Sequence, residues 1–179
     1  MKIEKNFFKG NADDVARKML GKVIVRKIAD KELRARIVET EAYFDDGDPA
    51  SRARQNGDLK KTMEMPGGTI LVYGVHSNWL INFVTGNPGE ASAVLIRALE
   101  PLNFDLKCSG PGLLTRGLEI GKEFHKRCVF DSEDIWIESD TGYAEPEIVE
   151  AFRIGVSNDL PEKMRFYIKD NPHVSRKEK

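Results

Sequence analysis

Two glutamates and a tyrosine stand at alternate positions near the end of one strand-like segment. The run RIVETEAY places Glu39, Glu41 and Tyr43 at i, i+2 and i+4, and such positions share one face of a β-strand. Burying a carboxylate without a partner is costly, so a core strand has no structural use for this pair, whereas a site that activates water does. Alternatively, the strand leaves the core here and its glutamates are hydrated, because acidic residues usually lie at the surface. The run alone leaves both interpretations open.

An arginine stands inside an otherwise apolar segment. Arg97 belongs to the run AVLIRAL, a pattern that indicates a strand buried on both faces. A buried guanidinium stays charged and needs an anionic partner. That partner is either structural, with Glu100 or Glu39 as candidates, or part of the chemistry, as a catalytic carboxylate or a phosphate.

Other motifs give weaker signals. The run SGPG, which begins at Ser109, has the composition of a capped helix start whose free N–H groups favour an anion. A cluster of basic residues after Glu41 is either a solvated loop or a contact for a phosphate backbone: Arg52, Arg54, Lys60 and Lys61. The scattered histidines and cysteines predict no metal site, and the absence of GxGxxG and GxxxxGK[ST] argues against a nucleotide cofactor.

The composition is that of an ordinary globular chain. With 179 residues, 40% of them hydrophobic and 32% charged, it predicts a single domain over residues 1–179. The formal net charge of −1 means that nucleic-acid binding would need a local basic patch. Isolated cysteines predict a cytoplasmic protein, and without an apolar leader or an 18-residue apolar run we expect neither secretion nor membrane spanning.

The elements that must position these residues are mostly strands. Hydrophobic periodicity and turn residues predict strands over 22–28, 33–43, 69–76, 78–85, 92–101, 134–139 and 164–170. They predict helices over 11–22 and 109–121, a short helical piece within 145–155, and a long irregular loop over 44–68. The sequence therefore predicts an α+β fold, a single compact domain with a mainly antiparallel, curved sheet and flanking short helices.

Taken together, the motifs resemble a known family. RIVETEAY, the acidic loop DDGDPAS, VYG, AVLIRALEPL, SGPG with LTRGLEI, RIGV, and RFYI with NPHVS occur in order along nearly the whole chain. In this order they resemble the alkyladenine (3-methyladenine) DNA glycosylases. The resemblance implies excision of alkylated or deaminated purines from double-stranded DNA after base flipping, without metal or cofactor, by a protein that we expect to be monomeric. With no lysine at the nucleophile position, it implies a monofunctional glycosylase without lyase activity.

The resemblance also implies roles for single residues. Glu41 matches the general base, and Arg97 the arginine that contacts the attacking water and the phosphate of the flipped nucleotide. Ile154 would hold that water through its backbone carbonyl. The remaining matches are to the stacking tyrosine, to the asparagine at the edge of the pocket and to the contacts with the DNA backbone: Tyr43, Asn82, and Ser109 with Gly110.

Three positions depart from the family pattern. Arg52 replaces a histidine, and its guanidinium would stack on or hydrogen-bond the base but would disfavour a cationic lesion. The tyrosine that wedges into the duplex has no clear counterpart, so three residues are candidates: Tyr73, His76 and Trp79. Leu113 replaces a lysine after SGPG, which removes one phosphate contact.

Two other functions are possible from these residues. The departures fit a non-catalytic nucleic-acid-binding module with the same fold. Glu39 and Glu41 would fit a hydrolase of small nucleosides or glycosides, but that chemistry needs carboxylates about 5–10 Å apart with a sugar between them, and neighbours on one strand face leave little room. The presence of both Glu41 and Arg97 favours the DNA glycosylase, because a pure binding module has no use for a base.

Overall fold

The chain folds around one antiparallel sheet. The computed structural model describes residues 1–177, and its strands are β1 (Val23–Ile28), β2 (Lys31–Tyr43), β3 (Ile70–Val75), β4 (Asn78–Val84), β5 (Ala93–Pro101), β6 (Ile135–Glu138), β7 (Ile148–Ala151) and β8 (Arg165–Ile168). The helices are α1 (Ala12–Met19), α2 (Asp58–Met63) and α3 (Pro111–Gly117), with 3-10 turns η1 (Lys5–Phe8), η2 (Arg52–Gln55) and η3 (Lys122–Phe124).

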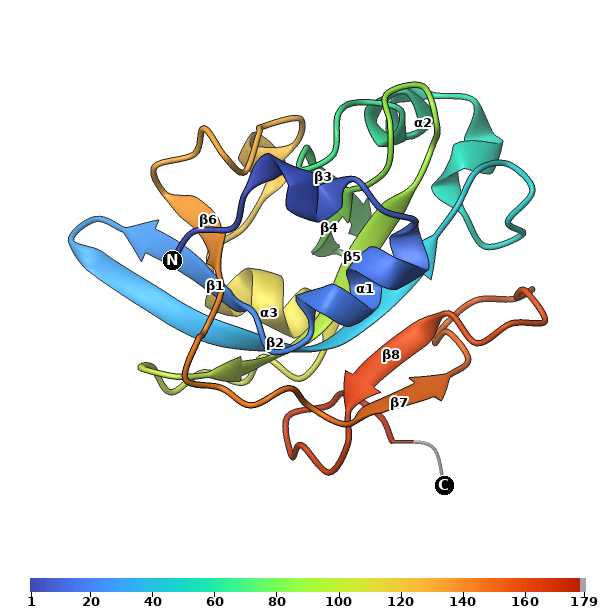
Figure 1. The fold of residues 1–179 in the computed structure, drawn as a ribbon. Coiled ribbons are helices and arrows are strands. Elements are labelled where there is room, and N and C mark those ends of the chain that lie inside the picture. The colour runs from blue at the N-terminus through green and yellow to red at the C-terminus, as the bar shows by residue number, and fades with distance from the viewer. Residues whose placement is uncertain (178–179) are drawn as a thin grey trace.

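The sheet is curled and carries short helices. Its strand order is β3-β4-β5-β2-β1-β6, while β8 pairs with both β2 and β7, and all these pairings are antiparallel. Figure 1 shows the curl and the position of α1 against it. The predicted α+β class, with a mainly antiparallel curved sheet and flanking short helices, is confirmed. Within residues 1–177, no helix has the length and apolar character to cross a bilayer.

The long strand β2 connects the core to the polar groups of interest. It pairs with β1, β5 and β8, and the hydroxyl of Thr40 donates to the carbonyl of Ala16 in α1 at 3.0 Å. Because neighbouring side chains of a strand alternate, Glu39 and Glu41 point away from α1. The apolar core lies on the α1 side, where Ala16, the β2 residues Val38 and Ala42, and Ile96 of β5 are fully buried.

Register shifts in the β2–β5 pairing occur where the charged residues lie. Between the pairs Ile37↔Leu99 and Thr40↔Ile96 the register changes twice. Irregularities of this kind re-aim side chains and are frequent beside active sites. Arg97 lies opposite this irregular stretch, on the same face of β5 as Leu95, and both line the cleft described below.

Three segments differ from the sequence-based prediction. Residues 145–155 were predicted to contain a helical piece, but β7 forms there because its residues pair with β8 over the full length of both strands. Tertiary pairing thus overrides a local pattern that suits either structure. The predicted irregular loop 44–68 contains η2 and α2. The predicted helix 109–121 is shorter, because α3 ends at Gly117 and η3 follows.

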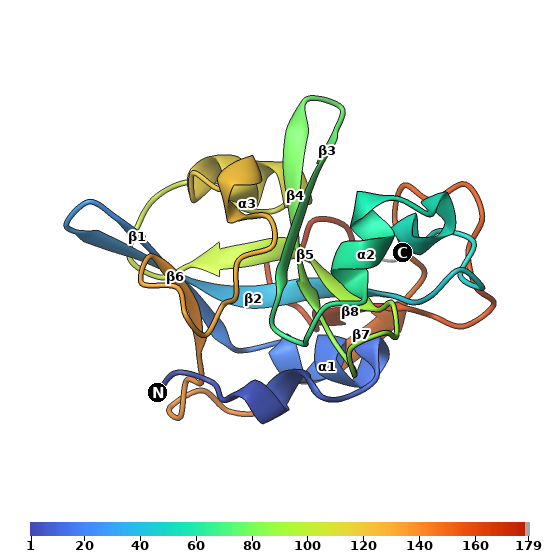
Figure 2. The same cartoon turned by 90° about the horizontal axis from the view of Figure 1, so that it is seen from above.

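The hairpin of β3 and β4 extends beyond the rest of the sheet. Figure 2 shows it projecting between α3 and α2. Only Asn82, Phe83 and Val84 of β4 pair with β5, so the outer part of the hairpin is a two-stranded ribbon. Its turn is formed by His76 and Ser77, both with positive φ (47° and 62°), the geometry of a tight hairpin turn.

Candidate active site

A cleft of about 710 Å³ opens beside the β3–β4 hairpin. Its other walls are the loop after β2, the start of α3 and the loop after β7. Six residues predicted from the sequence line it: Tyr43, Arg52, Tyr73, His76, Arg97 and Ile154. Of the other predicted residues, Glu41 and Asn82 are buried. Glu41 lies directly behind the wall, since it is hydrogen-bonded to two lining residues, Tyr43 and Ile154.

Glu41 is fully buried and held by three groups. Its Oε2 accepts a hydrogen bond from the Tyr43 hydroxyl at 2.7 Å, and its Oε1 accepts from the backbone N–H of Ile154, also at 2.7 Å. The Arg97 guanidinium lies 3.4 Å from Oε1. The carboxylate therefore neither points into solvent nor lacks partners, which excludes the interpretation of a strand that simply leaves the core.

The environment of Glu41 changes its acidity. Burial raises the pKa of the Glu41 carboxyl, and the raised value persists although Arg97, the Ile154 amide and the Tyr43 hydroxyl lower it. Burial and the Glu41 charge also raise the pKa of Tyr43 well above 10.0, so its hydroxyl stays protonated and donates. A carboxyl whose pKa is raised toward neutrality is suited to accept a proton.

Arg97 bridges the two glutamates of β2. Its Nε lies 3.4 Å from Oε1 of Glu39, while Nη1 approaches Glu41. Glu39 is also paired with Arg165 at 3.0 Å and accepts from the backbone N–H of Ser175 at 2.7 Å. Of the two structural partners predicted for Arg97, Glu39 is correct. The other, Glu100, pairs with Arg36 instead. Since a guanidinium lies between the two carboxylates, no sugar-sized space separates them.

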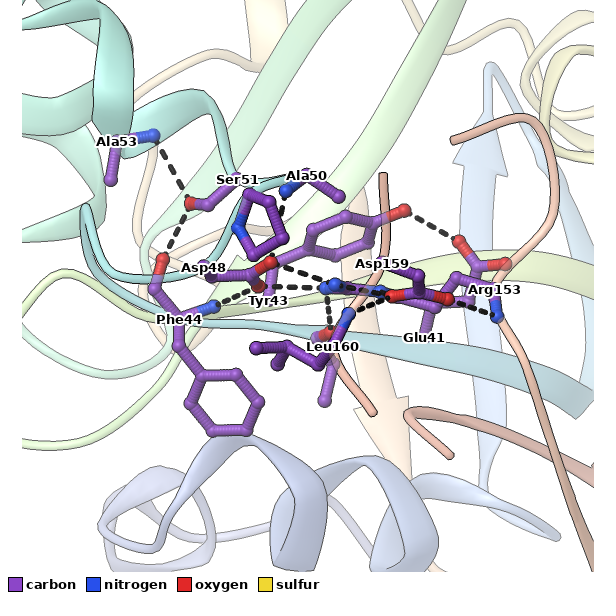
Figure 3. Close-up of polar contacts among 12 residues, drawn as sticks. Glu41, Tyr43, Phe44, Asp48, Ala50, Ser51, Ala53, Arg153, Asp159 and Leu160 are labelled. Atoms are coloured by element: carbon purple, nitrogen blue, oxygen red, sulfur yellow. Dashed lines mark hydrogen bonds and ion pairs between the residues drawn. The ribbon is translucent and has the colours of Figure 1, made fainter. Parts of the chain in front are cut away.

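Beneath Tyr43 lies a buried ion-pair network that sequence reasoning missed. Figure 3 shows Asp48 and Asp159 facing the Arg153 guanidinium. Nη1 and Nη2 of Arg153 donate to the two carboxylate oxygens of Asp48, each at 2.7 Å, and Nε donates to Asp159 at 2.7 Å. A fourth hydrogen bond joins Nη1 to the carbonyl of Ala42 at 3.0 Å. The network ties the loop after β2 to the loop after β7.

This network also supports the aromatic wall of the cleft. The Arg153 guanidinium lies 4.5 Å from the centre of the Tyr43 ring, and Ile154, the next residue, holds Glu41. The only sequence signals were the motif RIGV, which contains Arg153, and the acidic run around Asp48. Neither indicates a pairing between positions 105 residues apart.

A second aromatic group lines the site together with Tyr43. Tyr73, Arg52 and Asn82 line a small inner pocket together with Tyr43. The Arg52 guanidinium lies 5.1 Å from the centre of the Tyr73 ring, and the Asn82 side chain donates to the carbonyl of Leu71 at 3.1 Å. The predicted residues Tyr43, Arg52, Tyr73 and Asn82 are thus brought together.

The three candidates for the wedging residue occupy different places. Tyr73 lines the inner pocket and is therefore placed as a wall of the cleft. His76 is exposed at the hairpin turn and lines the cleft. Trp79 is 40% exposed but is not among the residues that line the cleft. His76 alone combines exposure at the tip with access to the cleft.

The segment before α3 differs from the prediction. Gly110 is the N-cap, and no side chain caps the helix, so Ser109 does not have the capping role predicted for it. The cleft is lined by Pro111 and Gly112 rather than by Ser109 and Gly110. Contact of the latter two with a DNA backbone stays a prediction.

Comparison with known proteins identifies a family for this chain. The family model for methylpurine-DNA glycosylase (MPG) matches residues 6–172. Relatives named "Putative 3-methyladenine DNA glycosylase" include one from Aeropyrum pernix, 39% identical over 97% of this chain and 93% of the relative. A second, from Borrelia garinii, is 35% identical over 98% and 100%, and a third, from Legionella pneumophila, is 37% identical over 98% of each.

The chain belongs to the methylpurine-DNA glycosylase family. The match extends over nearly all of the chain, as the resemblance of the motifs predicted.

Proposed function

We propose that this protein hydrolyses the N-glycosidic bond of damaged purines in DNA, with Glu41 as the general base. The observation that carries the proposal is the Glu41 carboxylate, fully buried and held by Tyr43, Ile154 and Arg97 directly behind a cleft with two tyrosines in its wall. A buried carboxylate with a raised pKa is costly for a module that only binds DNA. It is useful to an enzyme that must remove a proton from water.

The substrate nucleotide would leave the duplex before it reacts. A purine cannot be attacked at its sugar from within the stack, so the base is extruded at a cost of a few kcal/mol, which is lowest for a base that pairs badly. Tyr43 and Tyr73 line the cleft and would contact the faces of the extruded base. His76 at the exposed hairpin turn would occupy the space that the base leaves in the duplex.

The reaction transfers one proton and exchanges one bond. Glu41 takes a proton from water while the water oxygen bonds to C1′ of the sugar. The C1′–N9 bond breaks, and its electron pair leaves with the base. General-base assistance of this kind is worth about 10²–10⁴-fold in rate.

Water must reach a carboxylate that is already hydrogen-bonded. Each carboxylate oxygen has two lone pairs, and the hydrogen bonds from Tyr43 and Ile154 use one on each oxygen. One lone pair stays free on each oxygen, and the water would bind one of these two on the cleft side, next to Arg97. The expected carbonyl contact of Ile154 with this water would add to the N–H contact with Glu41.

The proposed enzyme has no lyase step. That chemistry needs an amine nucleophile, and among residues 1–177 no lysine lines the cleft. Reduction with borohydride during turnover should therefore trap no covalent protein–DNA adduct. Accumulation of such an adduct would contradict hydrolysis by water.

The test is excision from duplex oligonucleotides that each carry one lesion: hypoxanthine, 1,N6-ethenoadenine or N7-methylguanine. Abasic sites are cleaved with alkali after single-turnover incubation. Wild-type protein should release at least one base, and Glu41→Gln should release none while it still binds the duplex. Lys18→Gln, an exposed change on α1, is the matched control and should retain full activity. Undiminished excision by Glu41→Gln would refute the role of Glu41. Tight duplex binding without excision by the wild type would favour the binding module.

A further inference from the structure

Arg52 differs from Arg97 and Arg153 because it has no carboxylate partner, and it differs from Arg54, which also lines the cleft, because Arg54 is exposed and donates to the carbonyl of Pro49. Arg97 is shared by Glu39 and Glu41, and Arg153 is paired with two aspartates. Within residues 1–177, no carboxylate forms an ion pair or hydrogen bond with Arg52. The positive charge of its guanidinium is therefore not neutralised by the protein.

This charge lies in the wall of the proposed base-binding site. Arg52 lines both the cleft and the inner pocket, and its guanidinium lies 5.1 Å from the centre of the Tyr73 ring. The remaining wall of the inner pocket includes three apolar side chains: Met63, Leu71 and Ala93. Apolar walls reduce screening by water, so a charge here acts strongly on a bound base.

We propose that Arg52 selects uncharged purines that carry a carbonyl group, the 6-oxopurines such as hypoxanthine, and rejects purines made cationic by alkylation. This inference rests on the proposed function and specifies its substrate class. A guanidinium repels a cationic base at close range. It also carries two donors suited to the carbonyl oxygen and ring nitrogen of an oxopurine edge, the same pattern by which arginine binds guanine.

The leaving group gives a second reason for this selectivity. When the C1′–N9 bond of an uncharged oxopurine breaks, the electron pair makes the base anionic until it takes a proton from water. Arg52 stabilises that developing charge, as oriented donors do at other catalytic sites. A cationic alkylpurine becomes neutral when it leaves, so Arg52 gives it no such help and opposes its binding.

Three lesions separate the contributions of charge and carbonyl. Hypoxanthine is uncharged and carries the carbonyl, 1,N6-ethenoadenine is uncharged and lacks it, and N7-methylguanine is cationic. Single-turnover excision of each, divided by its spontaneous loss, should rank hypoxanthine first and N7-methylguanine last. Arg52→Gln should lower the ratio of hypoxanthine to N7-methylguanine by about 10- to 100-fold, the range expected for one bidentate contact.

A second variant and a control complete the test. Arg52→Lys keeps the charge but loses the planar fork, so it should still reject N7-methylguanine while it loses rate on hypoxanthine. Lys18→Gln changes the net charge equally and should leave the ratio unaltered. Preference for N7-methylguanine in the wild type, or an equal effect of Arg52→Gln on all three lesions, would overturn the inference and leave the proposed function intact. Failure of the wild type to excise any lesion would refute both.

Discussion

Replacing Arg153 by methionine tests whether the buried network beneath Tyr43 holds the cleft together. The side chains of Arg153 and Asp48 are 0% and 1% exposed, and Arg153→Met leaves the Asp48 carboxylate without its bidentate partner. Removing one partner of a buried pair costs about 3–5 kcal/mol. That is a large share of the ~5–15 kcal/mol that stabilises a typical domain.

Arg153→Met should remove only part of the protein's stability, because Asp48 keeps other hydrogen-bond partners. Its carboxylate also accepts from the backbone N–H groups of Phe44 and Ala50, each at 3.0 Å. At about 2–4 °C per kcal/mol for a chain of this size, the melting temperature should fall by roughly 6–20 °C. Urea unfolding followed by circular dichroism gives the free energy of unfolding, and a thermal scan gives the shift. Excision should fall too, since Tyr43 loses the guanidinium beneath its ring.

A double-mutant cycle isolates the pair. Arg153→Met combined with Asp48→Asn removes both charges, so the double variant should be less destabilised than the sum of the single changes by about 1–3 kcal/mol. Arg54→Met, an exposed arginine near the same loop, should change stability by no more than about 0.5 kcal/mol. If Arg153→Met and Asp48→Asn each cost under about 1 kcal/mol and their effects add, the network does not hold the loops.

Other consequences of the structure can be measured directly. Because the pKa of Glu41 is raised above 4.5 and a base must be deprotonated, excision should rise with pH through a midpoint above that value; a midpoint at or below it would contradict the geometry. Burial raises the pKa of Asp48, but Arg153 and the backbone N–H groups of Phe44 and Ala50 together lower it overall. The stabilisation by Asp48 is therefore present above the unfolded value of ~3.9 and is lost as pH falls through the folded value. The destabilisation by Asp48→Asn at pH 7 should therefore shrink under acid unfolding conditions, and a constant difference would argue against it. A Cβ at Gly112 would lie 2.7 Å from Cγ of Asn78, so Gly112→Ala should destabilise the protein by about 1–3 kcal/mol in urea unfolding, whereas Gly110→Ala, with 3.5 Å to its nearest neighbour, should not.

The sequence was sufficient to predict the position of a site residue where that position depends only on the alternation of side chains along its own strand. Glu39, Glu41 and Tyr43 lie on one face of β2 as predicted, since Arg97 contacts both glutamates and the Tyr43 hydroxyl donates to Glu41. Arg97 was recognised as a buried charge because the apolar residues around it define a strand. Local periodicity carries this information.

The sequence was not sufficient to predict contacts between segments that are far apart in the chain. Arg153 meets Asp48 across 105 residues, and no local pattern specifies which of many acidic residues will be its partner. The strand β7 was missed because its pairing with β8, rather than its own residues, decides its conformation. The register shifts beside Arg97 depend on how β2 and β5 meet, which one strand alone does not reveal.

The outer half of the β3–β4 hairpin has consequences for how the protein meets intact DNA. An isolated two-stranded ribbon is only marginally stable in water. Here the Arg116 side chain of α3 donates to Asn78, directly after the hairpin turn, and so ties the tip of the ribbon to α3. Backbone amides near His76 should then exchange with solvent sooner than those of β5. If the protein acts on DNA as proposed, any ordering of this turn on a duplex would draw on the free energy of association and would shorten each encounter with undamaged sequence.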